Sequence, residues 1–362
     1  MLAPVSRVHR IFAGTKLAKW AGYVDQYMLF PLTVRKALPG IPSDALFVFC
    51  DQALGPWIPL VKSRPHVIHA HDLLALRSAL GDFKENPQSF TGRIYQRYIR
   101  AGFRMARHFI SISNKTRDDL HLFGMVDPIS SDVVYNGLNY PYSPMPLDEA
   151  ASVLRQAGLP VPASGERILL SLGGSQWYKN QSGVISIYAR YVATESAPLA
   201  LWCVAPQPDA RTRRELSKVA DRGSVHFFQD IPNRTLQAAY SYARAFIFPS
   251  LAEGFGWPLI EAQACGCPVI TTNEPPMTEA AGDSAVYLPR LRHGDDLDSW
   301  GEIGASALRA LLAETVQEQE VRAERGRKWA ARFDPDRAID AYLAIYEKIL
   351  ASVAAPIVEG QG

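Results

Sequence analysis

The chain contains 362 residues, of which 48% are hydrophobic and 20% charged, and its formal net charge is +2. This length predicts two domains that each bury a core, and the composition excludes a disordered or low-complexity protein. The four cysteines are unevenly placed, no window approaches roughly 18 uninterrupted apolar residues, and the opening residues lack the apolar core of a signal peptide. We therefore expect a reduced, cytoplasmic protein that neither spans a membrane nor is exported.

Apolar runs predict the strands of a first domain, which we place at residues 1–145. The runs are ALFVFC at 45–50, HVIHAHD at 66–72, HFISIS at 108–113 and DVVYNG at 132–137. Ser113 is a predicted helix cap after the third run. The opening residues are polar and basic, and Gly14 indicates only a turn. The first domain therefore lacks a recognisable first strand.

Two histidines stand at the end of the second run. His69 and His71 would share one face of a strand, yet no third ligand accompanies them at a recognisable metal-site spacing. We expect His69 to pack in the strand and Asp72 to act as a helix cap or turn former. His71 is a candidate for the functional cleft.

Positive charge is concentrated in the first half of the chain. Residues 1–160 contain 18 Lys and Arg against 12 Asp and Glu, which leaves 20 against 24 in the remainder. Five arginines recur at steps of three and four along one helical stripe: Arg93, Arg97, Arg100, Arg104 and Arg107. The stripe indicates either contact with an anionic membrane surface or a solvated helix face, and the sequence leaves both open. We expect no nucleic-acid partner.

A proline-rich stretch separates the two halves. We place a linker at 146–165, a second domain at 166–334 and a final helical segment at 335–362. From residue 167 onward, strand-like runs such as ILLSLG, LALWCVA, VHFFQ and AFIFPS alternate with helical patterns. This alternation predicts a parallel sheet wrapped by helices. Ligands of such sheets bind beyond the carboxyl ends of the strands, here between the domains.

Two glycine-bearing loops predict anion sites in the second domain. In SLGGSQWYKN, Gly173 and Gly174 follow a strand and Lys179 enters a helix. In the second loop, Gly254 and Gly256 follow the apolar run 245–248. A glycine-rich turn at a helix N-terminus leaves backbone amides unpaired near the positive end of the helix dipole, which favours a phosphate group.

Two carboxylates flank the second loop, Glu253 and Glu261, with seven residues between them. Pro258 suits the first turn of the intervening helix, and Gly266 ends that helix. A ligand with an anionic middle and hydroxylated ends, such as a nucleotide sugar, suits this arrangement.

This segment resembles the retaining glycosyltransferases of family 4. Their pattern E-G-F-G-x-P-x-x-E-A-x-A-x-G-x-P-V-I, followed by E-x-x-G-D-x-A, matches EGFGWPLIEAQACGCPVI and EAAGDSA here, with Glu279 in register. The resemblance implies the GT-B fold, an α/β architecture in which two doubly wound Rossmann-like domains face each other across a cleft. It also implies that the last helix crosses back to the first domain.

Site roles follow from this resemblance. Glu253, Lys179 and His71 become the candidate catalytic residues, because Glu253 would contact the transferred sugar, Lys179 the leaving diphosphate, and His71 the donor sugar and acceptor. Candidate donor-binding residues are Gly173, Gly174, Gly254, Phe255, Gly256 and Glu261, the last through the ribose. The arginine that the family usually has at the position of Gly174 is missing, and Arg234 is a candidate to compensate for it.

The resemblance further implies retention of the anomeric configuration, with no metal and no cofactor beyond the nucleotide-sugar substrate. The GSQWYKN pattern favours GDP-mannose as donor, with a uridine-diphosphate sugar next. We expect a glycan or polyprenyl-linked oligosaccharide acceptor in surface polysaccharide synthesis, with the enzyme cytoplasmic or peripheral on the inner face of the plasma membrane. One alternative is a catalytically weak nucleotide-sugar or glycan-binding partner subunit of another transferase. An epimerase or phosphorylase of the same architecture lacks its expected motifs.

Overall fold

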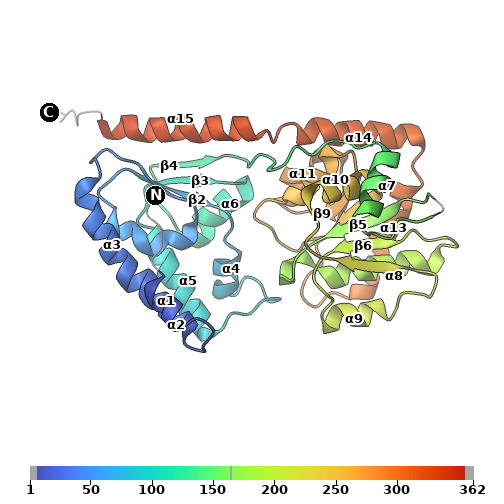
Figure 1. Ribbon diagram of the computed structural model, residues 1–362, viewed down its shortest axis with the longest axis horizontal. Coiled ribbons are helices and arrows are strands. Elements are labelled where there is room, and N and C mark those ends of the chain that lie inside the picture. Colours follow the sequence, from blue (N-terminus) through green and yellow to red (C-terminus); the bar gives the residue numbers. More distant parts are fainter. Residues whose placement is uncertain (1–5, 164, 355–362) are drawn as a thin grey trace.

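The computed structural model of the protein describes residues 6–163 and 165–354. These residues form an N-terminal lobe and a C-terminal lobe, coloured blue to teal and green to orange, with two long helices lying along one side of both (Figure 1). Each lobe contains its own parallel sheet. Residues 1–5, Ser164 and residues 355–362, which belong to the predicted first domain, linker and final segment, lie outside the described residues.

The N-terminal sheet contains four parallel strands in the order β1-β2-β3-β4. The strands are β1 (Phe47–Phe49), β2 (His66–Ala70), β3 (His108–Ser111) and β4 (Ser130–Val133). The connecting elements are the 3-10 segment η3 (Gln52–Leu60), α4 (Leu74–Leu80), α5 (Phe90–Phe103), α6 (Asn114–Asp119) and the π-helical turn η4 (Leu120–Gly124). Because the strands follow chain order, β1 is an end strand of this sheet among the described residues.

Helices precede β1 where the sequence shows no strand. They are α1 (Arg7–Ile11), α2 (Ala18–Val24), the π-helical turn η1 (Asp25–Leu29), α3 (Phe30–Ala37) and the short 3-10 turn η2 (Leu38–Gly40). The buried carboxylate of Asp25 accepts hydrogen bonds from the backbone amides of Val8 and His9, at 2.9 and 2.7 Å, which holds α1 against this helical segment. Tyr27 packs on Tyr95 of α5, with their hydroxyls 2.8 Å apart. The helical segment therefore covers α5.

The C-terminal sheet has six parallel strands in the order β10-β9-β8-β5-β6-β7. They are β5 (Ile168–Leu172), β6 (Leu201–Val204), β7 (Val225–Phe228), β8 (Ala243–Phe248), β9 (Val269–Thr272) and β10 (Val286–Leu288). The order reverses between β5 and β8, so this sheet is doubly wound. Ile168 and Leu170 pack into one hydrophobic cluster while Leu169 packs into another, since successive side chains of a strand point to opposite faces.

Helices cover both faces of the C-terminal sheet. They are α8 (Gln181–Thr194), α9 (Ala210–Leu216), α10 (Asn233–Tyr242), α11 (Trp257–Ala264), α12 (Met277–Ala281), α13 (Leu297–Leu312) and α14 (Val316–Ala330), with 3-10 turns η5 (Trp177–Lys179) and η6 (Gly282–Ser284). Residues of α10, α11 and α12 pack in the cluster that contains Ile168, and residues of α8 and α13 in the cluster that contains Leu169. The sheet is therefore buried on both sides, as all-parallel sheets require.

The predicted linker at 146–165 is wrong in one respect, because it contains helix α7 (Leu147–Gln156). Ala150 and Leu154 of α7 are fully buried in the cluster that also holds α10. Pro146 immediately precedes the first turn, where a proline does not interrupt helical hydrogen bonds. The prolines thus bracket a helix of the C-terminal lobe, and the connection between the lobes is the segment 134–146.

The predicted arginine stripe is also shorter than expected. Helix α5 ends at Phe103, so Arg104 caps it and Arg107 lies beyond it in the approach to β3. The guanidinium of Arg104 donates to the carbonyl of Met125 at 2.9 Å, and that of Arg100 to the carbonyl of Phe123 at 3.3 Å. Arg93 and Arg97 remain exposed on the helix.

The last helix, α15 (Pro335–Ala354), runs along the N-terminal lobe, whereas α14 lies over the C-terminal lobe (Figure 1). Ala338 and Ile349 of α15 are buried against Val67 of β2 and Ile110 of β3. His69 completes this contact, because its Nε2 lies 2.6 Å from the hydroxyl of Tyr346. Burial lowers the pKa of His69 to about 4. This histidine is a packed strand residue, as expected.

Candidate functional site

An ion pair between Lys179 and Glu253 lies between two strand ends of the C-terminal sheet. Lys179 ends η5 after β5, and Glu253 follows β8, the strand that pairs with β5. The Lys179 Nζ is 2.8 Å from Glu253 Oε1, and the two side chains are 16% and 9% exposed. Burial raises the pKa of the Glu253 carboxyl, and the neighbouring ammonium offsets part of that rise. The Lys179 ammonium also lies 5.0 Å from the ring centroid of Phe248.

The loop after Glu253 presents backbone amides to the site. Gly256 is the N-cap residue of α11 and has a φ of +107°, a conformation that glycine adopts without strain. No side chain caps the N-terminus of this helix by a hydrogen bond. Within the described residues, no hydrogen bond uses the amides of Gly254, Phe255, Gly256 or Trp257. Four unpaired donors at the positive end of a helix form an anion cradle beside the ion pair.

The two lobes touch directly at this loop. A Cβ on Gly254 would lie 2.2 Å from the carbonyl oxygen of His71, so only glycine permits this approach. The carbonyl of Gly254 accepts from the hydroxyls of Ser113 at 2.8 Å and Thr116 at 3.1 Å, both at the start of α6. Ser113 caps α6 as predicted, since it also accepts from the Thr116 amide at 3.0 Å. No local pattern predicted that this cap would contact the second domain.

The side chain of His71 is held by the end of β1. Its Nε2 lies 2.6 Å from the carbonyl oxygen of Cys50, and its backbone amide donates to Gln52 Oε1 at 3.0 Å. Because a carbonyl only accepts, Nε2 donates this hydrogen bond. Asp72 accepts from the amide of Leu74 at 3.0 Å, and burial raises the pKa of its carboxyl. Asp72 therefore forms the expected turn.

The first glycine loop lies beside Lys179. A Cβ on Gly173 would be 3.1 Å from the Cβ of Lys179, and one on Gly174 would be 2.1 Å from Oε1 of Gln176. The side chain of Gln176 thus fills the space where a side chain at position 174 would begin. A pocket of about 200 Å³ opens here and is lined by Gly174 and Gln176. Arg234, the candidate to replace the missing arginine, instead forms an exposed ion pair with Glu149 of α7 at 3.4 Å.

Glu261 is buried in α11 and is 8% exposed. The hydroxyl of Tyr240 in α10 donates to its Oε2 at 3.0 Å. Burial raises the pKa of this carboxyl to about 7, and the hydrogen bond from Tyr240 opposes that rise. Oε2 therefore has a partner within the lobe, whereas Oε1 has no hydrogen-bond partner among the described residues.

Glu279 joins the lobes in a way that its place in the motif did not reveal. Its carboxylate accepts from the backbone amides of Asn114 and Lys115 at 2.8 and 2.9 Å, from the Asn114 side chain at 3.1 Å, and from the Tyr135 hydroxyl at 2.9 Å. A residue of α12 thereby caps the N-terminus of α6 across the domain boundary. In the sequence, Glu279 is marked only by its match to the E-x-x-G-D-x-A pattern, which predicted no role for it.

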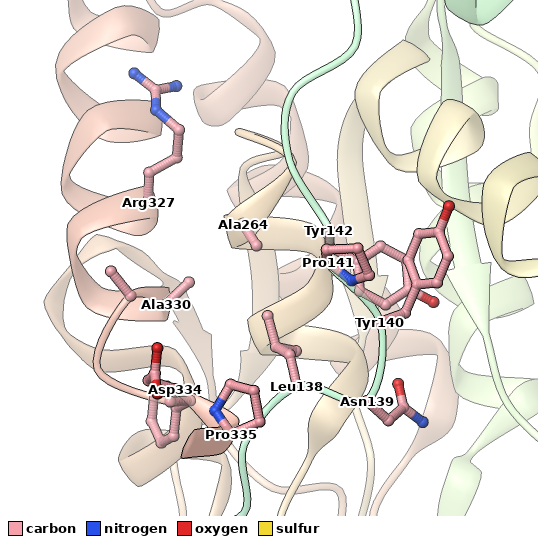
Figure 2. A pocket seen from close by; sticks show the side chains of 12 residues that line it. Leu138, Asn139, Tyr140, Pro141, Tyr142, Ala264, Arg327, Ala330, Asp334 and Pro335 are labelled. Carbon is pink, nitrogen blue, oxygen red and sulfur yellow. The ribbon is translucent and has the colours of Figure 1, made fainter. Parts of the chain in front are cut away.

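A wider pocket lies beside the segment 134–146 that connects the lobes, and not beside the ion pair. Its volume is about 670 Å³, and Figure 2 shows its walls: Leu138 to Tyr142 on one side, Arg327 and Ala330 of α14 on the other, and Ala264 of α11 between them. Asp334 and Pro335, at the start of α15, close its lower end in this view. None of the predicted site residues lines it.

Two further properties bear on the predicted partners. In residues 6–163 and 165–354, no three His, Cys, Asp or Glu side chains gather in a group that would hold a metal ion. Among the helices of the same described ranges, none is both long and apolar enough to cross a bilayer.

Comparison with known proteins extends the resemblance to both lobes. A family model described as Glycosyl transferases group 1 matches residues 160–287, and one described as Glycosyltransferase Family 4 matches residues 21–140. The O-antigen chain mannosyltransferase RfbU of Salmonella typhimurium is 25% identical over 215 residues, which cover 59% of this chain and 55% of that protein. The O-antigen chain mannosyltransferase B of Escherichia coli is 34% identical over 94 residues, covering 23% and 24%.

The chain thus matches about half of one of these relatives and a quarter of the other. Among solved structures, an alpha,alpha-trehalose-phosphate synthase (UDP-forming) from Burkholderia vietnamiensis superposes with a TM-score of 0.66 at 15% identity, covering 95% of this chain and 80% of that one. This likeness shows the fold and confirms the GT-B architecture. Since the two family models together cover both lobes, the chain belongs to glycosyltransferase family 4.

Proposed function

We propose that the protein is a retaining glycosyltransferase that moves a hexose from a nucleotide sugar to a glycan or lipid-linked oligosaccharide in surface polysaccharide synthesis. Mannose from GDP-mannose is the proposed donor, because the two O-antigen relatives are named as mannosyltransferases. The observation that carries this proposal is the juxtaposition of the four unpaired loop amides with the buried pair of Lys179 and Glu253.

The proposed chemistry follows from the charges at this point. When the bond between the sugar C1 and the diphosphate oxygen breaks, negative charge develops on the leaving diphosphate. The amides of Gly254 to Trp257 and the ammonium of Lys179 stabilise this charge with dipoles that are already oriented. Glu253 then exchanges its contact with Lys179 for the hydroxyls of the sugar. Glu261 accepts a hydrogen bond from a ribose hydroxyl.

The acceptor hydroxyl attacks C1 from the face that the diphosphate leaves, and its proton passes to an oxygen of that diphosphate. Retention follows from this geometry of attack. The backbone of His71 contacts Gly254 of the amide cradle, and its side chain is proposed to position the sugar and the acceptor. The mechanism uses no metal ion, so EDTA is expected to leave the rate unchanged.

We also propose that the enzyme is cytoplasmic and rests on the inner face of the plasma membrane. Arg93 and Arg97 are exposed on α5, and Phe90 and Ile94 of the same helix are 70% and 49% exposed. A helix that combines cations with exposed apolar side chains suits an anionic membrane surface.

The decisive experiment is to incubate the purified protein with GDP-mannose, UDP-glucose or UDP-N-acetylglucosamine and a lipid-linked oligosaccharide. Release of GDP with a product whose new linkage has the donor's anomeric configuration is the expected result. Thermal shift ranks the donors, because a ligand at 100 times its Kd adds about 2.7 kcal/mol of stability. If every nucleotide sugar binds but none is transferred or slowly hydrolysed, the protein is a binding subunit instead.

A further inference from the structure

The loop that joins α4 to α5 places an aromatic side chain against the second lobe. It spans residues 81–89, with the sequence GDFKENPQS, and α4 lies on the side of the N-terminal lobe that faces the second lobe (Figure 1). Phe83 is only 4% exposed and shares a small hydrophobic cluster with Leu74 of its own lobe and Ala252 of the second. Trp177 of the second lobe packs against this cluster. The burial of Phe83 therefore depends on contact between the lobes.

The N-terminal lobe holds this loop by polar contacts of its own. Arg77 of α4 forms an ion pair with Asp82 of the loop at 2.7 Å, and its guanidinium lies 4.3 Å from the centroid of the Phe83 ring. The side-chain amide of Asn86 donates to the hydroxyl of Ser78 at 3.1 Å. The first lobe thus fixes the ring of Phe83 on one side while the second lobe contacts it on the other.

The ring of Phe83 meets the turn that carries Lys179. Its centroid is 4.9 Å from that of the Trp177 ring, and the two planes are inclined by 55°. Trp177, Tyr178 and Lys179 are the three residues of η5, and the Lys179 amide donates to the carbonyl of Gln176 at 3.0 Å. Because Trp177 lies two residues before Lys179 in one short turn, the position of its ring constrains the backbone from which the lysine side chain extends.

Glu85 of the same loop supports the strand end that carries Glu253. It forms an ion pair with Arg290 of the second lobe at 3.2 Å, and the two side chains are 17% and 12% exposed. The Nε of Arg290 donates to the carbonyl of Leu251 at 2.7 Å, and the amide of Leu251 donates to the carbonyl of Tyr178 at 2.7 Å. Leu251 lies two residues before Glu253. These contacts therefore support the backbone on both sides of the ion pair.

We propose that Phe83 and Glu85 are positioning residues for the ion pair of the candidate site. Their loop belongs to the first lobe, yet it sets where the two charged groups of the second lobe stand. The inference rests on the proposed function, in which the Lys179 ammonium stabilises the leaving diphosphate. Such stabilisation depends on groups that are already in place, and a misplacement of about 1 Å can cost about 100-fold in rate.

The kinetic test compares Phe83→Ala with the full-length wild-type protein, using whichever of the three nucleotide sugars named above the wild type transfers. The kcat is expected to fall at least about tenfold. The KM for the donor is expected to stay within about threefold, because the amide cradle is unchanged and the lysine acts most strongly where charge develops. Phe83→Leu keeps an apolar side chain against Trp177 and is expected to restore kcat to within about threefold of the wild type.

Phe123→Ala is the matched control. The guanidinium of Arg77 also lies 5.0 Å from the centroid of the Phe123 ring, which packs against the core of the first lobe. The substitution therefore removes a ring from the same cation without changing the contact with Trp177. Its kcat is expected to remain within about twofold of the wild type, since distant sites act independently.

Glu85→Gln is the second test variant, because it removes the charge and keeps the size of the side chain. Its kcat is expected to fall at least about threefold in the wild-type background and no further in an Arg290→Gln background, since the effect passes through Arg290. If Phe83→Ala fails to fold by circular dichroism, Glu85→Gln takes its place in every measurement.

A second measurement needs no nucleotide sugar. Urea denaturation of Lys179→Met, Glu253→Gln and their double variant gives the coupling free energy of the ion pair. The same set in the Phe83→Ala background is expected to give less than half of that coupling, because the two groups no longer stand in register. A wild-type protein that neither transfers nor hydrolyses any nucleotide sugar contradicts only the proposed function, and the coupling still decides the positioning role.

Three results would overturn the proposal. One is an unchanged coupling free energy in the Phe83→Ala background. Another is a loss of kcat in Phe123→Ala as large as that in Phe83→Ala, which would assign both effects to the stability of the first lobe. The third is a rise in KM with unchanged kcat, which would place Phe83 against the donor itself and not behind Lys179.

Discussion

The ammonium of Lys179 lies 2.8 Å from the carboxylate of Glu253, and together they join the ends of two adjacent strands. Each of the two charged groups therefore already has a partner within the protein. In the proposed mechanism, a diphosphate draws the Lys179 ammonium and a sugar draws the Glu253 carboxylate before the groups act. The ion pair keeps both charged groups in a largely buried site, where an unpaired charge would lower the stability of the fold.

The first prediction concerns this pair. Lys179→Met and Glu253→Gln are each expected to lower transfer by about 100-fold, the scale for loss of one charge-stabilising group. Lys179→Met is also expected to destabilise the fold by about 3–5 kcal/mol, because it leaves a buried carboxylate unpaired. The double variant is expected to regain stability but not activity. Urea denaturation and initial rates check both parts, and additive stability losses would contradict the pairing.

Glu261 is expected to make the stability of the protein fall as the pH rises. Its carboxyl has a pKa of about 7 when folded because burial disfavours its charge, against about 4.5 when unfolded. Between these values the folded state holds a proton that the unfolded state has released, so stability declines from pH 4.5 to 7 and the loss is complete above it. Glu261→Gln is expected to remove a loss of up to about 3 kcal/mol. Urea denaturation at pH 5, 6, 7 and 8 measures the difference, and parallel curves for the two proteins would exclude it.

Glu261→Ala has a separate expected effect on the nucleotide. Loss of one hydrogen bond to a charged acceptor weakens binding by about 1–3 kcal/mol. Calorimetry with the nucleoside diphosphate measures this change. Wild-type affinity in the variant would remove Glu261 from the donor site.

Gly254→Ala is expected to hold the lobes apart. The new Cβ would meet the backbone carbonyl of His71 at 2.2 Å, and a backbone atom cannot rotate away. Transfer is expected to fall at least tenfold, since misplacing the catalytic groups by about 1 Å can cost 100-fold. Small-angle scattering is expected to show a larger radius of gyration. Gly40→Ala, where a Cβ meets nothing within 4 Å, is the control and is expected to match the wild type.

Glu279→Ala is expected to weaken the contact between the lobes. The substitution removes the acceptor of two backbone amides of α6 and of the Tyr135 hydroxyl. Each buried donor left without a partner costs about 1–3 kcal/mol of stability. The expected signs are a lower Tm and faster proteolysis of the segment 134–146. Glu320→Ala, at an exposed site on α14, is the control. A Tm equal to that of the wild type would show that the clamp does not hold the lobes together.

Binding to vesicles is expected to depend on the part of the arginine stripe that remains exposed. The double variant Arg93→Gln/Arg97→Gln is expected to bind anionic vesicles more weakly by about 1 kcal/mol per charge removed, as measured by sedimentation. High salt is expected to weaken vesicle binding by the wild-type protein. Arg325→Gln, exposed on α14 of the other lobe, is the matched control. Equal sedimentation of all three proteins would leave Arg93 and Arg97 as solvated residues.

Local sequence patterns were sufficient for the elements that frame the site. The run 245–248 is a fully buried part of β8, Ser113 caps α6, and the EGFG loop leads into α11 with Pro258 in its first turn. These features depend on periodicity, capping chemistry and backbone conformation within a few residues. They can therefore be predicted from the sequence alone.

The sequence by itself determined the two-lobed α/β architecture, the family and the types of residue at the cradle. Each of these follows from patterns and motifs that span only a few tens of residues at most. Only the tertiary structure decided that α7 belongs to the second lobe, that the arginine helix stops at Phe103, and that Glu279 caps a helix 165 residues away. The same is true of the approach of Gly254 to His71. Such contacts join segments that are distant in the chain, and they depend on how two domains dock, for which no local pattern exists.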